Sequence, residues 1–266
     1  RRVHNKPIPR FGGIAIFAGM MVALATFAAE DKGVPAAMAG CTLIYILGLI
    51  DDLKNLKPVV KLSGQVVSAV VVYAMGLRIE FITNYFGPGN MAFGDVLCFG
   101  VTVLWLVAIT NAVNLVDGLD GLAAGIAAIS ALCIGYVAYI HGHYIPTVAM
   151  MVIAGAALGF LPYNFHPAKI FMGDTGSLFL GGMVCALAFG IDFPVILLFA
   201  GIVYVIETLS DIIQIGSYKL THKRVFKMAP IHHHFEMCGW KEKKICVVFS
   251  LVNAAGCILA LVLLIK

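Results

Sequence analysis

Five aspartates stand near the ends of apolar segments in a chain where acidic residues occupy only 14 of 266 positions. Asp51 and Asp52 are adjacent, Asp117 and Asp120 lie three residues apart, and Asp174 follows later. Carboxylates beside apolar segments are costly to desolvate, and they repel one another unless a cation or a hydrogen-bond donor compensates them. Each one alone has an ordinary explanation as a helix cap. Together they favour a hard divalent cation such as Mg²⁺, which binds carboxylate and phosphate oxygens.

Two glycines, Gly173 and Gly176, flank Asp174 where the chain enters an apolar run. Exposed backbone N–H groups at the start of a helix can approach phosphate oxygens closely. A plain glycine turn with a Ser or Thr cap would leave the same pattern, so both interpretations stay open. The chain contains no Walker-type glycine loop. A Mg²⁺ ion typically keeps one or two carboxylates plus substrate phosphates, which suits a pyrophosphate substrate that arrives from the cytoplasm.

Three adjacent histidines, His232, His233 and His234, are the most unusual feature of the chain. A zinc site is one interpretation, but consecutive residues point in different directions and the i, i+4 spacing of a helical zinc site is absent. The other interpretation is a polar loop, Ala229–Glu236, that recognises or acts on an anionic substrate. Neighbouring Lys and Arg residues would supply the positive charge.

The segments that hold these residues have the composition of membrane spans. The chain is 61% hydrophobic and 12% charged, whereas soluble domains have roughly 25% charged residues. We expect an all-α polytopic membrane protein with one domain over residues 1–266. Apolar runs of about 20 residues predict nine helices, near 11–29, 34–50, 60–77, 93–110, 121–140, 146–162, 176–190, 193–217 and 243–265.

Basic residues are divided unevenly between the two sides that nine crossings define. The loops with the aspartates and histidines share one side, and of the 18 basic residues only Lys32, Arg78 and Lys266 lie on the other. The positive-inside rule places the richer side in the cytoplasm, so we expect the active site to face the cytoplasm. The composition resembles that of bacterial inner-membrane proteins, and we expect this location. The opposite loops are short except 78–92, where alternating residues before Gly87-Pro88-Gly89 predict a small external β-hairpin.

Over nearly its whole length the chain resembles the polyprenyl-phosphate N-acetylhexosamine-1-phosphate transferases. The triple histidine resembles that of the branch that transfers phospho-N-acetylmuramoyl-pentapeptide. We give this feature the most weight, because the family recognises the sugar and the peptide with the loop that contains it. Two other stretches, His4–Gly13 and Lys61–Gln65, look more like relatives that transfer N-acetylglucosamine-1-phosphate. The resemblance as a whole rests on Asp51-Asp52, Asn111–Gly121, Phe171–Leu178, and Ala229–Glu236 followed by Gly239-Trp240.

The resemblance implies a Mg²⁺-dependent reaction at the surface of the lipid bilayer. UDP-N-acetylmuramoyl-pentapeptide (UDP-MurNAc-pentapeptide) and undecaprenyl phosphate would give undecaprenyl-pyrophosphoryl-MurNAc-pentapeptide (lipid I) and UMP, in the first membrane step of peptidoglycan synthesis. It also implies ten transmembrane helices, so we expect one before Arg1, and a homodimer. Uridine nucleoside antibiotics such as tunicamycin are expected inhibitors, and no nucleic acid is expected as a partner.

The resemblance assigns roles to individual residues. Asp174 would bind Mg²⁺, and Asp51 would either orient or deprotonate the polyprenyl phosphate or form a covalent intermediate. Asp52 would support the cation site, and His233 is expected among the catalytic residues. Phe171 would stack on uracil, although the sequence alone favours packing. The other implied substrate-binding residues are Lys6, Lys61, Asn111, Asn114, Asp117, Gly118, Leu119, Asp120, Asn164, Gly173, Gln214, Ala229, His232 and His234.

Two rival functions remain open. A transporter or channel is one, but its ionisable residues should lie near the middle of the membrane on broken helices, whereas here they gather at one interface. The second rival keeps the chemistry and uses UDP-N-acetylglucosamine to start teichoic acid or another surface glycan. An assay that offers both nucleotide sugars separates these possibilities.

Overall fold

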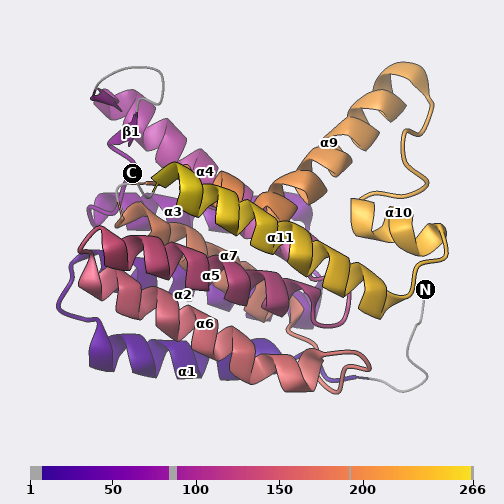
Figure 1. Cartoon of the computed structure of the whole chain (residues 1–266), viewed down its shortest axis with the longest axis horizontal. Helices are drawn as coiled ribbons and strands as arrows, with labels where there is room; N and C mark the ends of the chain where they lie inside the picture. The colour runs from indigo at the N-terminus through magenta and orange to yellow at the C-terminus, as the bar shows by residue number, and fades with distance from the viewer. Residues whose placement is uncertain (1–7, 84–88, 192, 265–266) are drawn as a thin grey trace.

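The computed structural model describes residues 8–83, 89–191 and 193–264, and Figure 1 shows that this part of the chain is almost entirely helical. The prediction of an all-α fold is therefore confirmed, and the prediction for Lys6 lies outside the described residues. The helices are α1 (Gly12–Phe27), α2 (Gly33–Lys54), α3 (Pro58–Ala74), α4 (Asp95–Val116), α5 (Leu122–Ile140), α6 (Tyr144–Asn164), α7 (Gly173–Phe189), α8 (Ile196–Ala200), α9 (Ile202–Thr221), α10 (Ile231–Met237) and α11 (Glu242–Leu264).

Several helices have the length and composition of membrane spans. Among the described residues, α2, α4, α5, α6 and α11 are long and apolar enough to cross a bilayer, and α1, α3 and α7 are shorter apolar helices. Large apolar side chains also cover the outside, as at Val22, Leu104 and Val262, each more than 60% exposed. Such a surface suits lipid rather than water. The chain is a multi-pass membrane protein.

Helix α7 lies at the centre of the bundle and packs against α1, α2 and α4. Every residue from Thr175 to Phe189 is buried. A Cβ atom on Gly48 of α2 would lie 2.5 Å from the carbonyl oxygen of Asp174, and one on Gly13 of α1 would overlap the backbone of Gly176. Because only glycine permits such close approach, α1 and α2 press directly on the first turn of α7. This turn carries Asp174.

The predicted continuous helix over 193–217 is wrong, because the chain breaks at Gly201 between α8 and α9. The side chain of Asn253 in α11 donates a hydrogen bond to the carbonyl of Ala200 at 2.9 Å and accepts one from the N–H of Val203 at 3.4 Å. A buried amide therefore satisfies backbone groups that the break leaves without helical partners. Beyond the break, α9 leaves the bundle at an angle to α11 (Figure 1).

Three other local predictions can be compared with the structure. Helix α4 continues to Val116, so the predicted loop 111–120 begins with more than a turn of helix. The predicted loop that carries the histidines contains a short helix, α10, which starts directly after Pro230. The predicted hairpin is confirmed: β1 (Phe81–Thr83) pairs antiparallel with β2 (Asn90–Ala92). It lies at the end of the bundle opposite α10 (Figure 1).

Candidate active site

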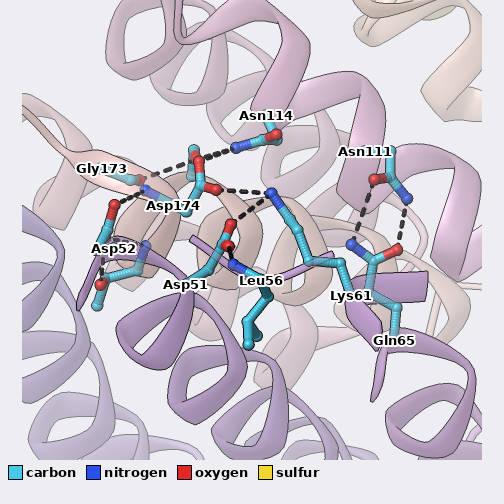
Figure 2. Close-up of polar contacts among 11 residues, drawn as sticks. Asp51, Asp52, Leu56, Lys61, Gln65, Asn111, Asn114, Gly173 and Asp174 are labelled. Atoms are coloured by element: carbon cyan, nitrogen blue, oxygen red, sulfur yellow. Dashed lines mark hydrogen bonds and ion pairs between the residues drawn. The ribbon is translucent and has the colours of Figure 1, made fainter. Parts of the chain in front are cut away.

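Three charged side chains from three helices meet at one end of the bundle (Figure 2). The ammonium group of Lys61, near the start of α3, lies 2.7 Å from Oδ2 of Asp51 and 2.6 Å from Oδ2 of Asp174. Asp51 is 7% exposed and also accepts the backbone N–H of Leu56 at 2.6 Å, which closes the turn after α2. One lysine therefore bridges two carboxylates that are 123 residues apart in sequence numbering, from 51 to 174.

Asp52 has a different environment from its neighbour. Its Oδ1 accepts the backbone N–H of Asp174 at 3.1 Å, and its Oδ2 accepts both the N–H and the hydroxyl of Thr175 at 2.8 and 2.6 Å. These are donors that the start of α7 would otherwise leave unpaired. Gly173 adopts the left-handed conformation with φ of 71°, and a Cβ there would lie 2.6 Å from Oδ2 of Asp52. Glycine at 173 thus lets Asp52 cap α7.

Asparagines of α4 complete the polar end of the bundle. Asn114 donates to Oδ1 of Asp174 and to the hydroxyl of Ser177, both at 2.8 Å. Asn111, one turn earlier, exchanges two hydrogen bonds with the buried amide of Gln65, at 2.6 and 3.2 Å (Figure 2). Asn114 therefore orients Asp174, whereas Asn111 ties α4 to α3.

Asp117 ends α4 beside this cluster and is half-buried. Burial raises the pKa of Asp117 well above its ordinary value, and the negative charges of Asp174, Asp52 and Asp120 raise it further. Within the described part of the chain, its carboxylate makes no hydrogen bond or ion pair. Among the residues described here, Asp51 and Asp174 thus share the single ammonium of Lys61, and the charges of Asp52 and Asp117 act on the same region, so the excess negative charge suits a further cation.

The three histidines of α10 have separate partners. His232 is fully buried, with Nδ1 3.1 Å from Oε1 of Glu207 in α9. His233 Nδ1 lies 2.5 Å from Oε2 of Glu236 one turn on, and His234 Nδ1 accepts the backbone N–H of Lys227 at 3.0 Å. The rings of His232 and His233 lie 4.1 Å apart, but within the described residues none of the three histidines belongs to a group of three candidate metal ligands, which disfavours the zinc interpretation.

A second mixed cluster joins Asp120, His166 and Glu242. His166 Nδ1 lies 3.1 Å from Oδ2 of Asp120 and 2.8 Å from Oε2 of Glu242, and the backbone N–H of Ala168 donates to the same aspartate oxygen at 2.9 Å. Their candidate ligand atoms lie within 4.8 Å of one another, so the group has the donors of a metal site. His166 lies directly between the two carboxylates. The cluster can therefore also be explained without a metal ion, as a cross-link between the α4–α5 turn and α11.

The remaining predicted residues lie around these clusters. The side chain of Asn164 bridges the N–H of Gly121 and the carbonyl of Ile170, both at 3.1 Å. Leu119 is buried, and Phe171 is half-buried with its backbone bonded to Pro9 and Gly12. Gln214 and Ala229 line a cavity of about 370 Å³ between α9 and the loop that precedes α10, together with Asp211, Ile215, Tyr218, Lys219, Arg224 and Met228.

Comparisons with known proteins identify the family of the chain. Residues 34–191 match the model of glycosyl transferase family 4. The chain is 38% identical to a phospho-N-acetylmuramoyl-pentapeptide-transferase of Clostridium botulinum (strain Eklund 17B / Type B), over 96% of this chain and 82% of the relative. It is 39% identical to the enzyme of that name from Clostridium perfringens (strain 13 / Type A), over 95% of this chain and 83% of the relative.

The chain belongs to the phospho-N-acetylmuramoyl-pentapeptide-transferase family. This confirms the resemblance inferred from the motifs. Within the family, the match to glycosyl transferase family 4 ends at residue 191, before the triple histidine. The relatives named above extend over at least 95% of the chain and so include α9 and α10.

Sequence reasoning assigned no role to several residues that contact the predicted ones. Glu207, His166 and Glu242 lie outside the motifs, and Gln65 ends the Lys61–Gln65 stretch without a role of its own. Glu207 in α9 and Gln65 in α3 are fully buried. Their position among apolar residues was the available signal, because polar residues in such helices usually face the interior of a bundle.

Proposed function

We propose that this protein transfers phospho-MurNAc-pentapeptide from UDP-MurNAc-pentapeptide to undecaprenyl phosphate, with release of UMP, in peptidoglycan synthesis. The reaction would take place at the cytoplasmic face of the bacterial inner membrane and would require Mg²⁺. The observation that carries the proposal is the cluster of Asp51, Lys61 and Asp174 at one end of a membrane bundle whose relatives bear the name of this transferase.

The carboxylate cluster fits a Mg²⁺ ion. Its donors are hard oxygen atoms, and the negative charge around Lys61 exceeds what one ammonium neutralises. Asp174 would hold the ion, with Asp117 beside it, while Asp52 stays engaged with the start of α7. Bound Mg²⁺ would neutralise charge on the pyrophosphate of the donor.

The residues of the chain would then align the two substrates. An oxygen of undecaprenyl phosphate attacks the β-phosphorus of the donor, a new P–O bond forms, and the bond to the bridging oxygen breaks so that UMP leaves with the electron pair. Asp51 would orient this phosphate or take its proton, and Lys61 would face the phosphates. The nucleoside of the donor would lie at the turn of Gly118, Leu119 and Asp120, with Phe171 against the base.

The deciding experiment measures UMP release by purified protein in detergent with undecaprenyl phosphate and Mg²⁺. UDP-MurNAc-pentapeptide and UDP-N-acetylglucosamine are offered in parallel, each with and without EDTA. We expect Mg²⁺-dependent release with the muramoyl donor only. Release with the glucosamine donor alone would assign the protein to the initiation of another surface glycan, and release with neither would disprove the proposed transfer.

A further inference from the structure

Glu207 and His232 form a pair with no exposure to solvent, between α9 and α10. Oε1 of Glu207 lies 3.1 Å from Nδ1 of His232, within ion-pair distance but without the angles of a hydrogen bond. The other carboxylate oxygen accepts the backbone N–H of the same histidine in a longer contact of 3.5 Å. One acid thus contacts both the ring and the backbone of His232, so it restrains the rotation of the ring.

The second ring nitrogen of His232 faces the turn that follows α4. A Cβ atom on Gly118 would lie 2.5 Å from Nε2 of His232. This nitrogen is buried and has no hydrogen-bond partner within the described residues. The ring therefore rests against the backbone of the residue next to Asp117, and its position limits how far this turn can move toward α10.

Cohesion alone does not explain the pair. Burying a carboxylate and an imidazole costs free energy that hydrocarbon side chains of the same size would not incur. Helix α10 is also held by aromatic packing, since the ring of Phe235 lies 4.6 Å from that of Trp240 and 5.9 Å from that of Phe249. The pair fixes the orientation of the His232 ring, which apolar packing alone would do poorly.

We propose that Glu207 is a positioning residue for the nucleotide donor. Glu207 fixes the ring of His232, and this ring packs against the turn at Gly118. The turn is therefore already in place when the nucleoside binds. The inference rests on the proposed function, because that function places the nucleoside at this turn. In this role Glu207 does not touch the substrate.

Glu207→Gln tests the role, because it keeps the volume of the side chain and removes its charge. In steady-state assays of UMP release with the purified full chain, we expect the KM for UDP-MurNAc-pentapeptide to rise about ten-fold, because the ring of His232 loses the negative charge that restrains it. The KM for undecaprenyl phosphate should stay within about two-fold. Partial misfolding would lower the maximal rate and change neither KM. Equal changes in both KM values, or an unchanged donor KM, would overturn the proposal.

Two further variants sharpen the test. Ser210→Ala is the matched control, because Ser210 is buried one turn away and its hydroxyl bonds only to the backbone carbonyl of Glu207. It should leave both KM values unchanged. Gly118→Ala places a methyl group against Nε2 of His232 and should raise the donor KM as well. The double variant with Glu207→Gln should raise the donor KM by less than the product of the two single-variant increases, since both changes disturb the same contact of His232. An increase equal to that product would contradict the proposal.

Binding of UMP, followed by isothermal titration calorimetry, separates this inference from the proposed function. If Glu207→Gln fails to fold, Glu207→Asp replaces it in both measurements. Wild-type protein that binds UMP and turns over, while the variant binds UMP with unchanged affinity, refutes the positioning role alone. Wild-type protein that neither binds nor releases UMP refutes both.

Discussion

Two polar clusters in this bundle are built differently. At the break between α8 and α9, the amide of Asn253 donates to the hydroxyl of Ser130 and to the carbonyl of Ala200, and Ser130 donates to the same carbonyl at 2.7 Å. This cluster is neutral, and both side chains are fully buried with their hydrogen bonds made. At the start of α7, by contrast, two carboxylates share one lysine, and one of the two, Asp174, stays partly exposed.

The difference distinguishes a structural cluster from the cluster proposed to be functional. Polar groups that only stabilise a membrane fold find partners within the protein, because an unpaired group in hydrocarbon is costly. A site for charged ligands keeps uncompensated charge at an accessible end, and the ligands supply the balance. Changes at the two clusters should therefore affect different measurements: activity at Asp51, Lys61 and Asp174, and stability at Asn253.

The largest effect is expected from Asp174→Asn. The change keeps the shape of the side chain and removes the charge that faces Lys61 and would hold Mg²⁺. UMP release should fall by about 10³-fold, the order expected when a group that stabilises transferring phosphate is lost. Asp95→Asn is the matched control, because Asp95 is exposed at the other end of α4. Full activity in Asp174→Asn would remove the metal role from this residue.

Lys61→Met comes next in expected size. Without the ammonium, Asp51 and Asp174 lose their common partner and repel each other, so we expect UMP release to fall by about 10²-fold and stability to fall on the order of 2 kcal/mol. Lys61→Arg should recover part of both. The exposed Lys54, in the last turn of α2, provides the control Lys54→Met. A Lys61→Met protein with unchanged melting temperature would show that the bridge contributes little to the fold.

From the sequence, the residues of the charged cluster could be found more easily than those of the neutral one. Asp51, Asp52 and Asp174 stand out because charge is rare at the ends of apolar segments, and their helices were predicted within several residues. The division of labour between Asp51 and Asp52 could not be predicted, since it depends on which way two adjacent side chains point at the end of α2. Only the packed start of α7 shows that Asp52 is its cap.

The break at Gly201 was missed for a related reason. Residues 193–217 are apolar enough to read as one helix, and a single glycine inside an apolar run does not reveal a break. The partner that makes the break tolerable, Asn253, lies 50 residues further on in α11. Contacts of this range leave no periodic signal in the sequence. The helical state of the three histidines was missed because α10 has only 7 residues, too short for a periodic pattern.

A moderate effect on stability alone is expected from Asn253→Leu. The change removes the acceptor for the N–H of Val203 and one of the three side-chain donors to the carbonyl of Ala200, which should cost about 1–2 kcal/mol. Thermal unfolding in detergent measures it, with Ser250→Ala on the same helix as the control. UMP release per folded molecule should stay within about two-fold. A large loss of activity without destabilisation would mean that this cluster also serves the reaction.

The smallest effect is expected from Asp117→Asn, and it depends on pH. The pKa of Asp117 is raised in the folded protein, so its ionised carboxylate destabilises the fold. The protonated carboxyl group therefore contributes stability that is fully present below the ordinary pKa of about 3.9. This contribution is lost as pH rises through the raised pKa of the folded protein. In EDTA, the asparagine variant should therefore melt about 3 °C or less above wild type at neutral pH. The advantage should vanish below about pH 4, where Asp117 is protonated in both states. Added Mg²⁺ should reduce this difference in melting temperature at neutral pH, because the ion compensates the carboxylate of Asp117. A difference that depends on neither pH nor Mg²⁺ would contradict the excess of negative charge inferred for this end of the bundle.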